Sequence, residues 1–339
     1  MIDRLTLLWE HALGRTGLRL DDNFFDLGGT PQTAQPLFSD IETLCGRKLP
    51  PFLLYHAPTP SAMAAALEKL DFGNFPRVIP LKAGATCTPI YIQPGMAGDP
   101  LTYFPLARRI ETQRPVHVMQ ARGLGDGEKP HERVEDIART YLETIRRITP
   151  QGPYLFIGIS LGGLVAFEMA QQLAASGQEV AFLVILESYP YTSFLSSRER
   201  LLLRARVIKR HVEKVDKLSL GDGVRYVGTR LKRKLYDNID ASRHNPESDV
   251  PPFSPEMQRL RDGDYYALTH YQPRPYQRKI KFVRASIPTH FPDDPLAAWK
   301  GLADDMDVET VTGDHNGIVT VHFDELATVI SRYLREAQL

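Results

Sequence analysis

Cysteine is scarce in this 339-residue chain, and the few thiols present are poorly placed for chemistry. Cys45 and Cys87 are the two cysteines, and neither belongs to a CxxC motif or to a Cys/His spacing typical of zinc sites. We therefore expect neither a disulfide framework nor a bound metal. Both residues are interpreted as small apolar side chains in a protein of a reducing compartment.

Net charge and long apolar runs are also missing. The 41 basic and 41 acidic residues cancel, so net charge gives no bulk attraction to nucleic acid or to a membrane surface. No apolar run reaches the length of about 18 residues that a spanning helix needs, and Asp3, Arg4 and Glu10 interrupt the apolar pattern at the start, unlike a signal peptide. We expect a soluble, cytoplasmic protein that binds neither nucleic acid nor membrane.

The first seventy residues predict four short helices. The opening helix follows from apolar residues at helical spacing and should end at Gly14. Residues 32–45 predict a second helix, interrupted near Pro36 and capped by Gly46. A short turn at LLYHAP is the third of these units, and it precedes a last amphipathic helix, which begins at Thr59 and Pro60.

This N-terminal part resembles the peptidyl carrier domains of nonribosomal peptide synthesis, through the phrases FFDLGG, GRKLP and APTPSAMAAAL in this order. In that family an acid or His and then a Ser follow the glycine pair, and the Ser bears the phosphopantetheine arm. Here Thr30 and Pro31 occupy those places, and proline has no side-chain nucleophile. The nearby hydroxyls of Thr30 and Thr33 lie one residue before and two residues after the position of that Ser, so neither occupies the attachment position. We predict that residues 1–72 form a carrier-like domain that accepts no arm, with Pro31 as its degenerate attachment position.

Beyond a linker at residues 73–78, apolar strand candidates alternate with helical patterns. Such alternation is typical of α/β proteins with a mostly parallel sheet and helices on both faces. The strand candidates are IPLKA, TPIYIQ, VHVMQA, YLFIGIS, VAFLVILES, KIKFVRAS and DVETV. We expect residues 79–339 to form this second domain.

A GxSxG motif lies between a strand and a helix of that domain. Gly158-Ile159-Ser160-Leu161-Gly162 follows the apolar residues LFI and precedes a helical pattern. In this context the glycines permit a sharp turn that raises the Ser160 hydroxyl above the edge of the sheet, near the positive end of the helix. The motif predicts a nucleophilic serine.

A serine nucleophile requires a base and an orienting acid. His315, in VTGDHNGIV, follows a strand and precedes the terminal helix, so it should lie at the same sheet edge as Ser160. Glu187, at the end of AFLVILES, is the favoured acid, and Asp293 and Asp294, after the next strand, are the alternatives. All three acids lie between Ser160 and His315, so each of them fits the chain order Ser, acid, His.

Residues 79–339 resemble the thioesterase domain that ends nonribosomal peptide and polyketide synthetases. The phrases that carry the resemblance are QPGMAGDPLTYFPLARRI, QARGLGDGEKP, QGPYLFIGISLGGLVAFEMAQQLAASGQEVAFLVILESYP and VTGDHNGIV. This resemblance implies an α/β-hydrolase fold and an acyl-enzyme formed on Ser160. It also implies that the backbone N–H groups of Leu161 and Gly95 bind the oxyanion. If the position of the second donor in the loop is displaced by one residue, Met96 takes the place of Gly95. The family usually has Asp where this chain has Glu187.

The interval between Glu187 and Lys279 is longer than a strand connection needs and predicts a helical lid at about residues 190–275. From Arg198 to Lys234 it carries 13 Lys and Arg against 4 Asp and Glu, a difference of +9. This segment is either a solvated helix face or a binding site for an acidic carrier or for a pantetheine phosphate.

The two resemblances together predict a thioesterase that acts in trans. Its substrates would be acyl or peptidyl thioesters on the phosphopantetheine of another carrier protein or synthetase module, or on coenzyme A, because Pro31 prevents loading in cis. Release would occur by hydrolysis or by cyclisation, and no covalent cofactor is expected. The N-terminal unit has a net charge of −3 over residues 1–71 and would serve as a docking or gating module for the thioesterase domain. The alternatives are a serine esterase or acyltransferase on small esters or acyl-CoA, and a catalytically silent docking protein.

Overall fold

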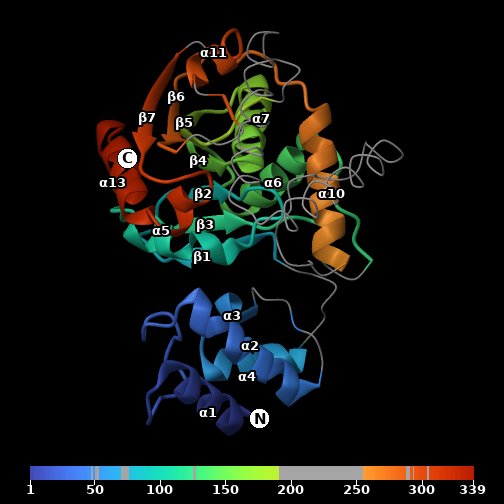
Figure 1. Cartoon of the computed structure of the whole chain (residues 1–339), viewed down its shortest axis with the longest axis vertical. Helices are drawn as coiled ribbons and strands as arrows, with labels where there is room; N and C mark the ends of the chain where they lie inside the picture. Colours follow the sequence, from blue (N-terminus) through green and yellow to red (C-terminus); the bar gives the residue numbers. More distant parts are fainter. Residues whose placement is uncertain are drawn as a thin grey trace, which may run out of the picture.

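The computed structural model describes a small helical unit and a larger α/β unit (Figure 1). The described residues are 1–46, 49, 53–69, 76–124, 127–190, 255–287, 291–292, 294–303 and 305–339. None of the helices in these ranges is both long enough and apolar enough to cross a bilayer.

Four helices form the N-terminal unit: α1 (Ile2–Leu13), α2 (Pro31–Cys45), α3 (Leu53–His56) and α4 (Pro60–Lys69). Trp9 and Phe24 are fully buried between them and meet edge to face, with ring centroids 6.3 Å apart. Gly14 ends α1 in the left-handed conformation, as glycine does at many helix ends. The predicted interruption near Pro36 is wrong, because α2 continues through this residue. Proline there removes one backbone donor, and the rest of the helix tolerates the loss.

The larger unit is built on one seven-stranded sheet. Its strands are β1 (Val78–Lys82), β2 (Ile90–Gln93), β3 (Val116–Met119), β4 (Tyr154–Ile159), β5 (Val180–Leu186), β6 (Ile280–Ala285) and β7 (Met306–Val311). They lie in the order β1-β3-β2-β4-β5-β6-β7. Only the edge strand β1 is antiparallel to its neighbour, so the carboxyl ends of the other six meet at one edge.

Helices cover both faces of the sheet (Figure 1). α6 (Val134–Ile148), α7 (Leu161–Ala175), α10 (Pro255–His270) and α11 (Pro295–Trp299) contribute to the apolar core on one face. The helices η1 (Pro100–Tyr103), α5 (Phe104–Arg109), α12 (Gly317–Thr320) and α13 (Phe323–Glu336) contribute to the core on the other.

Successive strand residues alternate between these two cores. In β4, Leu155 and Ile157 belong to the α5/α13 side and Phe156 to the α6/α7 side, which is the period of two that strands impose. Both faces are therefore buried, as continuous apolar strands predict. The predicted fold class, an α/β-hydrolase with a small helical domain before it, is confirmed.

The FFDLGG loop of the helical unit contacts helix α5 of the larger unit. The Phe25 and Phe104 rings lie 4.6 Å apart, and Arg108 Nη1 lies 3.0 Å from Asp26 Oδ1. Arg108 also lies over the Phe104 ring. The ion pair is about half exposed at both ends, so we assign most of the stabilisation to the buried Phe25 ring.

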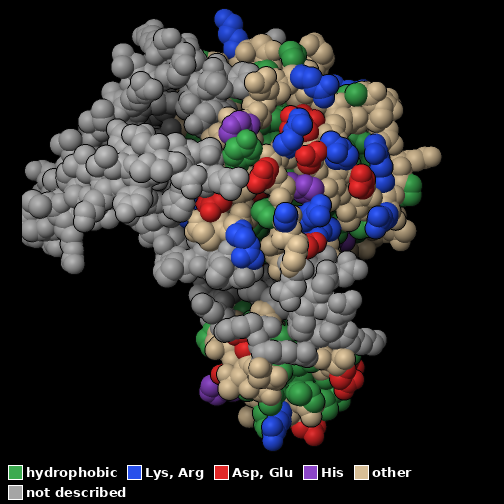
Figure 2. All heavy atoms as spheres, turned by 90° about the vertical axis from the view of Figure 1, so that its right-hand side faces the viewer, with side chains coloured by type: hydrophobic (Ala, Val, Ile, Leu, Met, Phe, Trp, Pro, Cys, Tyr) green, Lys and Arg blue, Asp and Glu red, His purple; other side chains and the backbone are tan. Residues whose placement is uncertain are grey.

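The described surface shows no broad region of one charge in the view of Figure 2, where blue and red side chains are interspersed over the larger unit. The basic segment predicted at 198–234 lies outside the described residues. So does most of the predicted lid, of which α10 is the described part.

Candidate active site

Ser160 lies at the sharp turn between β4 and α7. Its backbone angles are φ 54° and ψ −122°, which a non-glycine residue rarely adopts. A strained backbone of this kind persists only where the surrounding structure fixes it, and such residues cluster at functional sites. The turn places Ser160 immediately before the first turn of α7, where backbone N–H groups have no partner within the helix.

The glycines of the motif are required by close backbone approach. A Cβ on Gly158 would collide with the backbone of Gly162 and Gly163, and a Cβ on Gly162 would collide with the carbonyl oxygens of Gln93 and Pro94. The helix can therefore pass directly over the ends of β2 and β4 only because these positions lack side chains.

Strand register brings Glu187 beside Ser160. Ile159 of β4 pairs with Leu186 of β5, and the Ser160 N–H donates to the Leu186 carbonyl at 3.0 Å. Glu187 is 4% exposed and has a positive φ of 45°, so its side chain turns back over the sheet edge. Its Oε1 accepts from the Ala285 N–H at 2.7 Å, which anchors the carboxylate between β5 and β6.

His315 lies close to the other oxygen of this carboxylate. Its Nδ1 is 3.5 Å from Glu187 Oε2, which is within ion-pair reach and longer than a good hydrogen bond. Catalytic contacts of this kind are often long before substrate binds. The imidazole comes from the loop between β7 and α12, and the Phe291 ring lies 4.8 Å from it. The carboxyl edge of the sheet thus carries serine, carboxylate and imidazole.

The two alternative acids differ from Glu187 in position. Asp294 is the N-cap of α11, where its Oδ1 accepts from the Leu296 and Ala297 N–H groups at 3.0 and 3.3 Å. This bonding accounts for the carboxylate without any role for the imidazole. Asp293 lies outside the described residues.

The predicted oxyanion donors lie on either side of Ser160. Leu161 opens α7, and Gly95 is so close that a Cβ there would lie 3.4 Å from the Ser160 Cβ. However, the Gly95 N–H donates to the Tyr103 hydroxyl at 2.9 Å, and this bond would have to open before Gly95 could bind an oxyanion. Met96, the alternative donor, follows it in the same loop.

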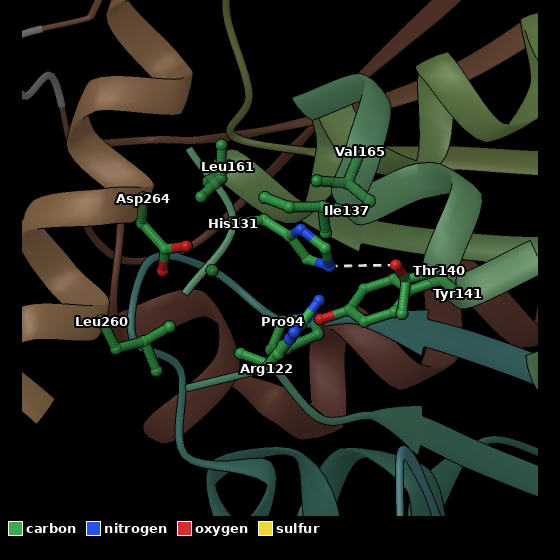
Figure 3. Close-up of a pocket in the computed structure, with 12 residues that line it drawn as sticks. Pro94, Arg122, His131, Ile137, Thr140, Tyr141, Leu161, Val165, Leu260 and Asp264 are labelled. Atoms are coloured by element: carbon green, nitrogen blue, oxygen red, sulfur yellow. Dashed lines mark hydrogen bonds between the residues drawn. The ribbon is translucent and has the colours of Figure 1, made fainter. Parts of the chain in front are cut away.

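A pocket adjoins the serine along the first turns of α7 (Figure 3). Its lining combines apolar side chains such as Leu161 and Val165 with the polar side chains of His131, Thr140 and Asp264. The His131 Nε2 shares a hydrogen bond with the Thr140 hydroxyl at 2.9 Å, drawn as a dashed line in Figure 3. Burial, with nearby Arg122 as a further cause, lowers the pKa of His131. The pocket thus brings apolar and hydrogen-bonding side chains together beside the Ser160 turn.

The loop that resembles a carrier attachment loop leads into α2. Thr30 is the N-cap of this helix, with Pro31 as the first helical residue. The Thr30 Oγ1 accepts from the Thr33 N–H at 3.3 Å, and the Thr33 Oγ1 accepts from the Thr30 N–H at 2.9 Å. Both nearby hydroxyls are thus part of a reciprocal capping arrangement.

Sequence reasoning missed three polar groups around the serine: Tyr103, His131 and Asp264. Tyr103 ends η1, but nothing in its spacing marked it as a partner of Gly95. Asp264 and His131 belong to no motif. Within the described ranges, no group of three or more His, Cys, Asp or Glu side chains is arranged to hold a metal ion.

Two protein families match the chain. The family described as "Thioesterase domain" matches residues 88–334, and the family described as "Phosphopantetheine attachment site" matches residues 3–67.

Individual relatives are much longer than this chain. An indigoidine synthase of Dickeya dadantii is 34% identical over 179 residues, which cover 53% of this chain and 12% of that protein. A dimodular nonribosomal peptide synthase of Bacillus subtilis is 37% identical over 191 residues, 55% of this chain and 8% of that protein. The crystal structure of holo-AB3403, a four-domain nonribosomal peptide synthetase, has a TM-score of 0.57 at 22% identity, covering 98% of this chain and 26% of that one. This last likeness shows the fold alone.

Proposed function

Because the chain belongs to the thioesterase-domain family of serine hydrolases, we propose that it releases acyl or peptidyl chains from pantetheine thioesters. The single observation that carries the proposal is the carboxyl edge of the sheet, where Ser160 is held at φ 54° and Glu187 lies 3.5 Å from the His315 imidazole. Its relatives include a nonribosomal peptide synthase, which supports a carrier-bound substrate.

The proposed reaction has two steps. In the first, Ser160 Oγ attacks the thioester carbonyl while His315 takes the hydroxyl proton, and Glu187 holds the imidazole in the required tautomer. Backbone N–H groups of Leu161 and of the 95–96 loop stabilise the oxyanion. The C–S bond then breaks, His315 returns the proton to the departing thiol, and the acyl group stays on Ser160 as an ester.

In the second step, water or a hydroxyl or amine of the acyl chain attacks that ester. His315 takes a proton from the attacking group and gives it to the Ser160 oxygen as the C–O bond breaks. Attack by water yields a free acid, and attack by the chain's own nucleophile yields a ring.

Thioester turnover tests this function directly. We expect the full chain to cleave an acyl-pantetheine thioester faster than an oxygen ester of the same acyl group, because the thiolate is the better leaving group. The measurement is the kcat/KM of each substrate, with the released products identified by mass spectrometry. Turnover of the oxygen ester alone would indicate a general esterase, and no turnover of either would indicate a docking protein.

We further propose that the substrate arrives in trans, on another carrier or on coenzyme A. Pro31 offers no hydroxyl, and the Thr30 and Thr33 hydroxyls take part in capping α2. The FFDLGG loop of the N-terminal unit instead contacts α5 of the same chain through Phe25 and Asp26. This contact favours a role for the N-terminal unit in docking on its own thioesterase domain.

Loading with the arm tests this part of the proposal. After incubation with a phosphopantetheinyl transferase and coenzyme A, the intact mass of the wild-type chain should not change. The Pro31→Ser variant should gain one phosphopantetheine, because it places a hydroxyl in the first turn of α2, where N–H groups favour a phosphate. Gln32→Ser, with the hydroxyl one residue later, is the matched control and should stay unmodified. A mass gain by the wild-type chain would contradict trans action.

A further inference from the structure

The loop beside Ser160, residues 94–98, is held in a strained conformation. Ala97 has a positive φ of 47°, which is unfavourable for a residue with a side chain. The turn is closed by the Gly98 N–H, which donates to the Gly95 carbonyl at 2.9 Å. Because Gly95 is in contact range of Ser160, any shift of this loop changes where its N–H groups lie relative to the reacting carbonyl.

One side chain from a distant element anchors the strained residue. Asp264, on α10, accepts a hydrogen bond from the Ala97 N–H through Oδ2 at 2.8 Å. It is 5% exposed, and Figure 3 shows its carboxylate directed into the pocket that borders Leu161. The contact joins residues 167 positions apart and links the described part of the predicted lid to the loop beside the nucleophile.

The carboxylate is a costly group to place there. Burial raises the pKa of Asp264 to about 7, with the Ala97 hydrogen bond opposing that rise. Tyr141 lies close enough for the two groups to interact electrostatically, His131 and Arg122 line the same pocket, and among the described residues Asp264 forms no ion pair. Burial of a carboxylate without a paired cation is costly, and the hydrogen bond to the strained Ala97 is what the acid supplies at this position.

Resting on the function proposed above, we propose that Asp264 is a positioning residue for the thioesterase reaction. Its hydrogen bond to Ala97 holds the 94–98 loop beside Ser160, so that the Gly95 N–H can turn to the Ser160 intermediate once its bond to the Tyr103 hydroxyl opens. The bond is made within the protein before substrate binds. Its loss should therefore lower kcat and leave substrate binding nearly unchanged.

The test compares Asp264→Asn with Asp264→Leu in the full chain. The Asn side chain keeps an acceptor for the Ala97 N–H, so its kcat should stay within about threefold of wild type. The Leu side chain has none, and we expect kcat to fall about 100-fold, the cost of a displacement of about 1 Å at a reacting centre. The KM should change by less than about threefold in both variants. The melting temperature of Asp264→Leu should stay close to that of wild type, because removal of a buried carboxylate offsets the loss of the acceptor for the Ala97 N–H.

Asp262→Leu is the matched control. It removes a carboxylate from the same helix, two residues away, which accepts a hydrogen bond from Gln258 instead of the loop. Its kcat should equal that of wild type. The inference is overturned if Asp264→Leu keeps the wild-type kcat, or if Asp264→Asn and Asp264→Leu lose kcat equally. It is also overturned if the loss of kcat in Asp264→Leu follows a lower melting temperature. If the wild-type chain itself cleaves no thioester, the proposed function fails instead.

Discussion

Replacement of Ser160 by alanine should lower kcat for an acyl-pantetheine thioester by at least about 10⁴-fold. The hydroxyl is the group that would attack the thioester carbonyl and form the acyl-enzyme. Melting temperature should not fall, because Ala removes only an oxygen from a turn that Gly158 and Gly162 make possible. Steady-state kinetics at saturating substrate measure the effect.

Ser176→Ala is the control for this substitution. Ser176 lies at the other end of α7, where its hydroxyl donates to the Leu173 carbonyl at 2.9 Å. This variant should retain wild-type kcat. If Ser160→Ala kept more than about a tenth of the wild-type kcat, another nucleophile would have to be sought, because removing a triad serine elsewhere costs far more.

Glu187→Gln should lower kcat by about 10³- to 10⁴-fold, as loss of the triad acid does in other serine hydrolases. The amide can still accept from the Ala285 N–H, so the side chain should stay in place while the charge that stabilises the imidazolium is lost. The same kinetic measurement, together with circular dichroism to verify the fold, checks this result.

Glu187→Asp provides a more demanding comparison. Aspartate is one methylene shorter, and Glu187 Oε2 already lies 3.5 Å from the His315 Nδ1, so shortening should widen this gap and reduce kcat. Asp294→Asn is the matched control, because Asn is as good an N-cap for α11 and should leave kcat unchanged. A large loss in Asp294→Asn with full activity in Glu187→Gln would transfer the acid role to the 293–294 segment.

The elements that place the site could be predicted from local patterns. Continuous apolar runs such as LFIGI mark strands buried on both faces, and the glycines around Ser160 are needed for a turn that the structure shows at φ 54°. These features depend on residues that are neighbours in sequence. The same holds for the Gly14 cap of α1.

The remaining features of the site could not be predicted, because they depend on contacts between segments that are far apart in the sequence. The Tyr103 bond to the Gly95 N–H arises because η1 folds back over the loop after β2. The Asp264 bond to Ala97 arises only when α10 returns to the sheet edge. The order Ser, acid, His does not distinguish Glu187 from Asp294; strand register and the capping of α11 do, and they favour Glu187 as the proposed acid.

The central claim is that an acyl group passes from a pantetheine thiol to the oxygen of Ser160. The most direct measurement is mass spectrometry of the wild-type chain, quenched in acid during turnover of an acyl-pantetheine thioester and digested to peptides. We expect an acyl ester on Ser160 in the peptide containing GISLG, formed during turnover and lost when substrate is exhausted. Turnover with the acyl group on another residue, or labelling that persists unchanged in Ser160→Ala, would contradict it.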